Sequence, residues 1–104
     1  MTLFDSHCHL DAAEFDTDRA AVLERARAAG VTGQLVPAVD AASWPSLQRI
    51  CAAEPDLYPA YGLHPMYLER HRPVHLEQLV EWVERERPCA IGECGLDFHV
   101  EWLD

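Results

Sequence analysis

Residues 17–38 read TDRAAVLERARAAGVTGQLVPA and join a helix-forming stretch to an apolar one. Residues 17–29 are rich in Ala, Leu, Glu and Arg, which favour a helix that Asp16 or Thr17 caps and Gly30 ends. Residues 31–38 contain β-branched and other apolar types, which predict a strand. A helix that leads directly into a strand is typical of α/β proteins.

The same alternation continues on both sides of this stretch. We expect further strands over residues 3–8, 57–63 and 89–94, and a second helix between Ser43 and Pro55. The third helix is the clearest, because its apolar residues recur at helical spacing before Pro88 ends it: Leu76, Leu79, Val80 and Val83. The predicted order is therefore strand–helix–strand throughout.

This order predicts parallel strands joined by helical crossovers. Each predicted strand–helix unit spans about 30 residues, and eight such units approach the ~250 residues of a (β/α)8 barrel. We therefore expect an α/β fold, namely the N-terminal part of a TIM-type barrel with about four strands and three helices. On this interpretation residues 1–104 form a single incomplete barrel domain.

Composition excludes several classes of protein. The formal net charge of −10 argues against a protein that binds nucleic acid mainly by neutralising phosphates. No window approaches the ~18 consecutive apolar residues of a membrane span, and the first residues do not resemble a secretion signal. Four cysteines without C-x-x-C spacing suggest free thiols, so we expect a cytoplasmic location and no membrane partner.

The first predicted strand ends in the pattern Asp5-Ser6-His7-Cys8-His9. Side chains alternate along a strand, so Asp5, His7 and His9 share one face while Cys8 points to the other. Two imidazoles at this spacing reach one cation if they point into the barrel, where active sites lie at the C-terminal ends of strands. We favour a metal role for this pair over a structural one, and for Cys8 we expect a buried thiol.

Two further side chains lie where predicted strands end. Glu93 stands close to Gly92 and Gly95 and is either solvated or directed at a cation, because an unpaired buried carboxylate is costly. His64 precedes a proline at the end of the third strand and is either a rim histidine bonded to the backbone or a substrate contact. We give His71, His75 and His99 little weight, because they fall on loops or at a helix start.

Three ordered motifs resemble the TatD family of metal-dependent deoxyribonucleases: FDSHCHLD at 4–11, YGLHP at 61–65 and IGECGLD at 91–97. The likeness implies a (β/α)8 barrel of which these residues form the first two-fifths. It also implies that His7 and His9 bind one divalent metal, which Glu93 bridges to a second. His64 would lie near the substrate phosphate, and Asp97 would support the site.

For a complete barrel the resemblance implies hydrolysis of DNA phosphodiesters by a metal-activated water, with Mg²⁺ or Zn²⁺ as the two ions and Glu93 as a catalytic ligand. Asp5 is a candidate to orient the histidines. The cations would let an acidic protein hold DNA strands or ends.

Other interpretations stay open. The same metal site serves amide or ester hydrolysis, including deacylation of mis-acylated tRNA, since fold does not fix substrate. Residues 1–104 alone are expected to be inactive and could be a truncated product that survives by self-association, because four strands cut from a barrel leave unpaired edges. A DNA-binding regulatory module is the weakest alternative, because no basic helix-turn-helix pattern is present.

Overall fold

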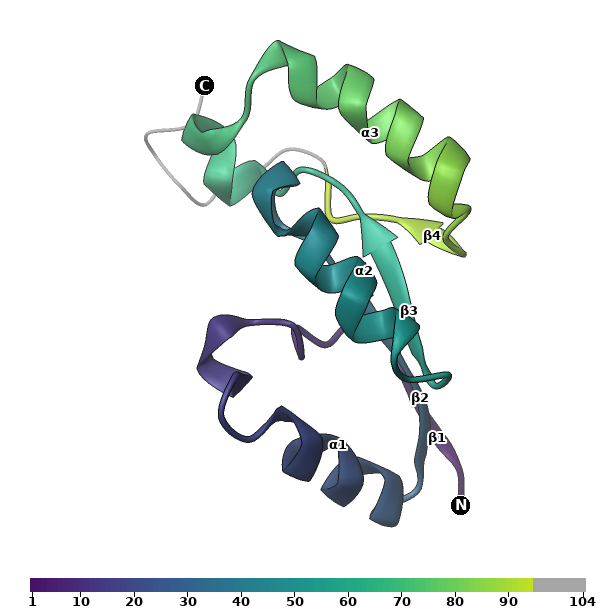
Figure 1. Cartoon of the computed structure of the whole chain (residues 1–104). Coiled ribbons are helices and arrows are strands. Elements are labelled where there is room, and N and C mark those ends of the chain that lie inside the picture. The colour runs from purple at the N-terminus through teal and green to yellow at the C-terminus, as the bar shows by residue number, and fades with distance from the viewer. Residues whose placement is uncertain (95–104) are drawn as a thin grey trace.

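Four parallel strands lie side by side in chain order, β1-β2-β3-β4, and one α-helix connects each successive pair (Figure 1). The computed structural model describes residues 1–94. The strands are β1 (Leu3–Asp5), β2 (Val31–Pro37), β3 (Leu57–Tyr61) and β4 (Ala90–Ile91). The helices are α1 (Arg19–Ala28), α2 (Trp44–Ala52) and α3 (Pro73–Glu86), with short 3-10 helices η1 (Ala13–Phe15), η2 (Ala41–Ser43) and η3 (Pro65–Arg70). The predicted order of elements and the parallel pairing are confirmed.

The two outer strands are shorter than the sequence predicts. β1 ends at Asp5, so His7 and His9 follow the strand instead of lying on it. The chain nevertheless stays beside β2, because the Cys8 N–H donates to the Leu35 carbonyl at 3.0 Å. β4 ends at Ile91, after which the backbone turns toward the end of β2. The C-terminal ends of the strands thus continue as irregular segments that carry the candidate ligands.

The first helix begins later than its composition predicts. Its N-cap is Asp18, not Asp16 or Thr17, and the Asp18 side chain makes no capping hydrogen bond. Gly30 adopts φ +99°, a left-handed conformation that glycine tolerates best, and its carbonyl accepts from the Leu3 N–H at 2.8 Å. Gly30 therefore ends the helix as predicted and leads the chain into β2.

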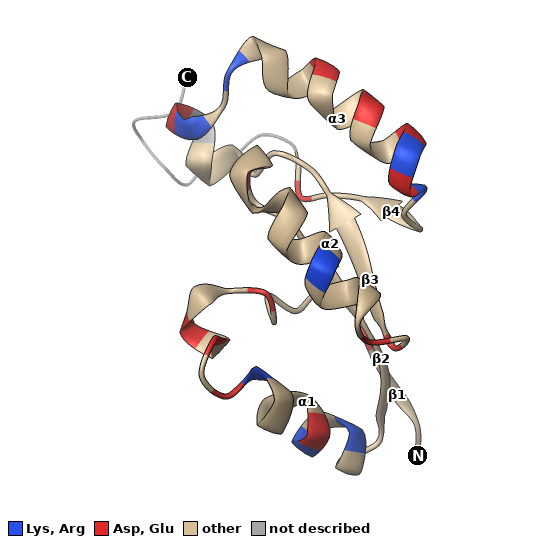
Figure 2. Ribbon diagram, viewed as in Figure 1, with Lys and Arg blue, Asp and Glu red and all other residues tan. Residues whose placement is uncertain are grey.

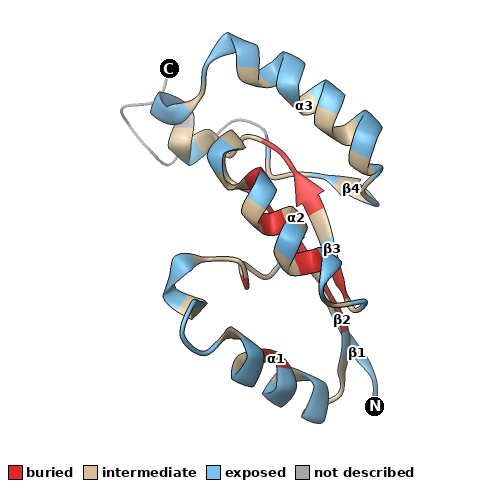
Figure 3. Ribbon diagram, viewed as in Figure 1, coloured by how far each residue is buried: buried red, intermediate tan, exposed pale blue. Residues whose placement is uncertain are grey.

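The core lies between the sheet and the helices, and α2 contributes most to it (Figure 3). Trp44 and Leu47 of α2 are almost fully buried against Val36 of β2 and Tyr61 of β3. The indole N–H of Trp44 donates to the Gly62 carbonyl at 3.2 Å, which satisfies a buried donor. Burial of these large side chains fixes the strands whose ends carry the site.

The third helix packs less completely than predicted. Leu79 and Trp82 contact the core, but Leu76 and Val80 are 62% and 58% exposed. Of the apolar residues at helical spacing in α3, Leu79 therefore faces the core while Leu76 and Val80 do not, because the helix packs through Leu79 and Trp82. Ile91 of β4, the last strand of the described sheet, is also exposed. An apolar surface is therefore left open on α3 and β4.

Charged side chains are distributed over the helices and the connecting loops (Figure 2). Arg27 at the end of α1 forms ion pairs with Asp56 and Glu54, which precede β3, at 2.7 and 2.6 Å. These contacts join the α1–β2 unit to the loop before the next strand.

Among the described residues, no helix is both long and apolar enough to cross a membrane.

Candidate metal centre

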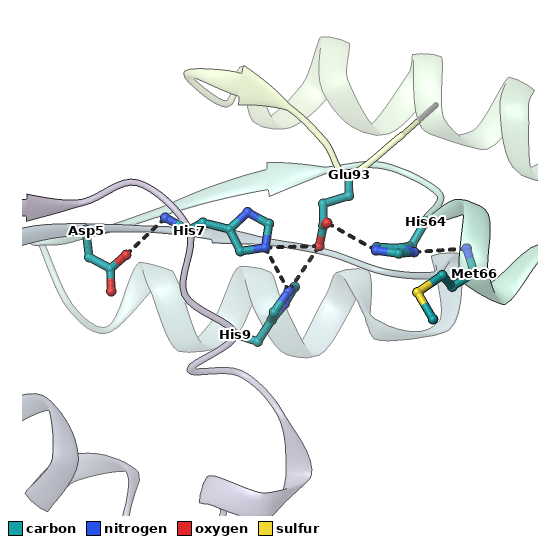
Figure 4. Close-up of polar contacts among 6 residues, drawn as sticks. All are labelled: Asp5, His7, His9, His64, Met66 and Glu93. Carbon is teal, nitrogen blue, oxygen red and sulfur yellow. Dashed lines mark hydrogen bonds and ion pairs between the residues drawn. The ribbon is translucent and has the colours of Figure 1, made fainter. Parts of the chain in front are cut away.

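Three side chains from opposite ends of the described chain converge beyond the sheet (Figure 4). The Nε2 atoms of His7 and His9 lie 3.4 and 3.0 Å from Oε2 of Glu93. The two Nε2 atoms are 3.2 Å apart. The sequence predicted each of these residues from its place at a strand end, and the fold brings all three together.

Backbone contacts hold Glu93 at this position. Its N–H donates to the Ala38 carbonyl, just beyond β2, at 3.2 Å, and the Gly92 N–H donates to the Tyr61 carbonyl of β3 at 3.0 Å. Gly62 allows this close approach, because a Cβ there would lie 2.6 Å from the Glu93 carbonyl oxygen. The absence of a side chain at Gly62 therefore lets the end of β4 reach the histidines.

Sequence reasoning missed the residue that holds the loop following His9. The guanidinium of Arg19, at the start of α1, donates to the main-chain carbonyls of Leu10, Asp11 and Ala12 at 2.8, 3.2 and 3.1 Å. It also pairs with Asp16 at 2.8 Å. An arginine within a helix-forming stretch gives no sequence signal for this role, because its partners are main-chain atoms.

His64 contacts the cluster through the other carboxylate oxygen. Its Nε2 atom lies 3.1 Å from Oε1 of Glu93, and its Nδ1 atom accepts from the Met66 N–H at 3.0 Å. An Nδ1 that accepts a hydrogen bond is unprotonated, so a neutral His64 carries its proton on Nε2. His64 therefore donates to Glu93 and leaves Oε2 to face His7 and His9.

The remaining candidates lie apart from the donor atoms. Asp5 accepts from the main-chain N–H of His7 at 3.1 Å, so it contacts the backbone of the ligand segment and not an imidazole ring. Cys8 packs against the core, and burial is the main cause that raises the pKa of its thiol. Asp97 and His99 lie outside the described residues.

The three donors fit a divalent cation. Oε2 of Glu93 is buried and has no hydrogen-bond partner among the described residues, although its side chain is 24% exposed overall. Bonds of 2.0–2.1 Å with tetrahedral angles place two ligand atoms about 3.3 Å apart. Octahedral angles place them about 3.0 Å apart. The observed spacings of 3.0–3.4 Å lie in this range, so one cation can lie within bonding distance of all three atoms when each Nε2 presents its lone pair.

A pocket of about 560 Å³ adjoins the cluster and shares His9 and His64 with it. Its polar lining includes three carboxylates and one guanidinium, from Asp11, Asp16, Asp40 and Arg70. Arg70 pairs with Asp40 at 3.2 Å. Burial is the main cause that raises the pKa of Asp11. The pocket therefore offers a substrate hydrogen-bond acceptors and an aromatic ring, that of Tyr67, beside the candidate metal.

Parallel strands joined by helical crossovers carry the His-x-His/Glu cluster beyond their C-terminal ends, which is where the active sites of barrel enzymes lie. The family model for TatD related DNase matches residues 4–102. The chain belongs to the TatD related DNase family.

Individual relatives agree with this assignment. The chain is 45% identical to the uncharacterized metal-dependent hydrolase YjjV of Escherichia coli over 89% of its length, and 36% identical to the 3'-5' ssDNA/RNA exonuclease TatD of Pantoea vagans over 93%. The crystal structure of E. coli YjjV, a TatD homologue, superposes with a TM-score of 0.89 at 40% identity and covers 95% of the chain. The described sheet is thus the N-terminal half-barrel of a TatD-type TIM barrel. The chain spans only 37–39% of the length of these relatives.

Proposed function

We propose that the protein is a divalent-metal-dependent hydrolase, and specifically a deoxyribonuclease that cleaves phosphodiester bonds. The observation that carries this proposal is the convergence of His7, His9 and Glu93 around one buried carboxylate oxygen, which has no hydrogen-bond partner within residues 1–94. Two of the relatives considered above are named a metal-dependent hydrolase and an ssDNA/RNA exonuclease, which supports the chemistry and the substrate class.

Four residues of this chain have separate roles in the proposed reaction, namely His7, His9, His64 and Glu93. His7 and His9 would hold the cation through their Nε2 atoms, and Glu93 would contribute a hard carboxylate oxygen that suits Mg²⁺ or Zn²⁺. His64 holds its Nε2 proton toward Oε1 of Glu93, which orients the carboxylate and places an imidazole between the cluster and the pocket. When bound, a divalent cation supplies activated water and offsets charge on the phosphoryl oxygens.

We propose two ions in the working site, with Glu93 as the ligand they share. Its Oε1 and Oε2 atoms face opposite neighbours, His64 on one side and the two cluster histidines on the other. Each carboxylate oxygen has two lone pairs, so Oε1 can accept from His64 and still offer a lone pair to a second cation. Asp5 supports the site by holding the His7 main chain, and Asp97 stays a predicted supporting residue.

We also propose that residues 1–104 form one incomplete barrel domain within a longer catalytic chain. Two observations support this domain organisation. The chain covers only 39% of the matched YjjV structure. Leu76, Val80 and Ile91 are exposed, and a following strand and helix would cover these three side chains. We expect the 104-residue chain alone to lack activity and to self-associate through the edges of β1 and β4. A monodisperse monomer in light scattering would contradict this expectation.

Four unpaired cysteines favour a reducing compartment, and we propose a cytoplasmic location. An intact-mass measurement on the protein from its native source tests both the length and the absence of disulfides. A mass near that of a ~250-residue barrel is expected, and a mass of 11.8 kDa would overturn the proposed domain organisation.

The functional test compares single-stranded DNA oligonucleotides with a panel of esters and mis-acylated tRNA, using the complete protein with and without Mg²⁺, Mn²⁺ or Zn²⁺. We expect metal-dependent DNA cleavage that is lost in Glu93→Gln, a variant that keeps the size of the side chain and removes its charge. The matched control is Glu24→Gln, an exposed position on α1. If an ester is hydrolysed and DNA is not cleaved, the deoxyribonuclease proposal is wrong and the ester or tRNA deacylase alternative takes its place.

A further inference from the structure

His71 holds the loop that follows β3, and it is not one of the three residues of the metal cluster. His64 precedes η3 and His71 follows it, and the Nε2 atom of His71 lies 2.8 Å from the main-chain oxygen of His64. The six residues of η3 are thereby held between the two histidines. The half-buried ring of His71 thus contacts the residue that donates to Glu93.

The position of the proton on His71 follows from its partners. A main-chain carbonyl only accepts hydrogen bonds, so Nε2 of His71 carries the proton. Its Nδ1 atom is buried and has no hydrogen-bond partner within residues 1–94. The contact that His71 makes with its surroundings through the ring nitrogens of the described structure is therefore the hydrogen bond from Nε2 to the His64 carbonyl.

The same reasoning continues from His64 to the carboxylate. Nδ1 of His64 accepts from the Met66 N–H, so its Nε2 proton points at Oε1 of Glu93. Both the main chain and the ring of His64 are thus fixed by contacts within one loop. Oε1 accepts this hydrogen bond, and Oε2 is directed at His7 and His9.

We propose that His71 is a positioning residue for the metal centre. It fixes the His64 main chain, His64 fixes the rotation of the Glu93 carboxylate, and the carboxylate then directs Oε2 at the two histidine nitrogens. This inference rests on the proposed function, because it assumes that His7, His9 and Glu93 hold a divalent cation. It adds a residue outside the donor set to the machinery that prepares the site.

Two isosteric variants separate the donated hydrogen bond from the shape of the ring. The amide nitrogen of glutamine occupies the place of imidazole Nε2, whereas that of asparagine occupies the place of Nδ1. His71→Gln keeps a donor for the His64 carbonyl, and His71→Asn removes it. His75→Ala is the matched control, because His75 stands near the same loop but only accepts from the Arg72 N–H at the start of α3.

The first readout is Mn²⁺ affinity, measured by isothermal titration calorimetry on the complete protein. Loss of a partner that orients a ligand weakens metal binding by about 10–100-fold. We expect His71→Asn to weaken it by about tenfold, at the low end of this range, while His71→Gln and His75→Ala bind as the wild type does. Equal affinity of His71→Asn and wild type, or equal losses in the Asn and Gln variants, would overturn the proposal.

The second readout needs no metal. Imidazole ¹⁵N shifts of His64 in the metal-free protein report which ring nitrogen carries the proton. We expect a single form protonated at Nε2 in the wild type and in His71→Gln, and a mixture in His71→Asn. An unchanged His64 spectrum in His71→Asn would contradict the positioning role even where stability falls.

Failure of the proposed function gives a different result. If the wild type does not bind Mn²⁺, the proposed metal centre is wrong. The same conclusion follows if Glu93→Gln binds Mn²⁺ as tightly as the wild type does. If the wild type binds Mn²⁺ and Glu93→Gln abolishes binding while His71→Asn changes nothing, the metal centre stands and the role of His71 is refuted.

Discussion

The Nε2 atom of His9 lies 3.0 Å from Oε2 of Glu93, although the two residues stand at opposite ends of the described chain. Each follows an outer strand of the sheet, β1 or β4, and two central strands separate them. They meet because the segment after β4 bonds to Tyr61 at the end of β3 and to Ala38 beyond β2, while the segment after β1 stays beside β2. The contact between His9 and Glu93 therefore depends on the arrangement of all four strands.

Removal of His9 should therefore weaken metal binding more than loss of any supporting residue. His9→Ala deletes one of three donors, and we expect Mn²⁺ affinity to fall by more than the 10–100-fold typical of supporting contacts. Calorimetric titration of the complete protein measures this, with His75→Ala as the histidine control outside the cluster. Unchanged affinity in His9→Ala would show that the donors do not act together.

Gly62 should be needed for the site although it carries no functional group. A Cβ at Gly62 would lie 2.6 Å from the Glu93 carbonyl oxygen, a main-chain atom that moves only if Glu93 moves. We expect Gly62→Ala to weaken Mn²⁺ binding by at least about tenfold and to lower the melting temperature.

Gly92→Ala is the matched control, because a Cβ there would meet nothing within 4 Å. It should bind Mn²⁺ nearly as the wild type does. Equal losses in the two variants would argue that backbone flexibility, and not close approach, is what the glycines provide.

Asp56 should make stability depend on pH in the acid range. Hydrogen bonds from Arg27, at 2.7 and 2.8 Å, are the main cause that lowers the pKa of this carboxyl in the folded state. A lowered folded pKa stabilises the protein above the unfolded pKa of about 3.9 and loses that contribution as pH falls through the folded value.

We expect the free energy of unfolding of the wild type to exceed that of Asp56→Asn by a small, constant amount above pH ~5 and to converge with it below pH ~3.9. Urea denaturation across this range measures the difference, with Glu24→Gln on the exposed face of α1 as the control. A difference that grows as the pH falls would have the wrong sign for this ion pair.

The cysteines should differ sharply in reactivity. Burial is the main cause that raises the pKa of Cys51 to about 12, whereas Cys89 is exposed. At pH 8 a thiol of pKa 12 has on the order of a thousandfold less thiolate than an ordinary cysteine of pKa about 8.5. Alkylation followed by mass spectrometry should show early modification of Cys89 and modification of Cys51 only after unfolding. Early labelling of Cys51 would mean that α2 opens readily.

The sequence by itself determined the order of elements, the parallel pairing and the main candidates for the site. Helix formers before Gly30, apolar runs of strand length and polar side chains at strand ends are local signals, and local chemistry decides them. His7, His9 and Glu93 were identifiable because they fall at the C-terminal ends of predicted strands, where the active sites of barrel enzymes lie. The motifs also sufficed to indicate the family.

The tertiary structure decided what depends on main-chain atoms and on neighbours remote in sequence. Arg19 binds three carbonyls, His71 binds a fourth, and Gly62 makes room for Glu93, none of which leaves a pattern in the sequence. The exposure of Leu76 could not be predicted from the sequence either. A stripe of apolar residues indicates that a helix packs against something, but it does not show which of those residues make the contact. The sequence gives the type of each side chain. The position of a main-chain carbonyl, and the free space beside a glycine, are determined only when the chain folds.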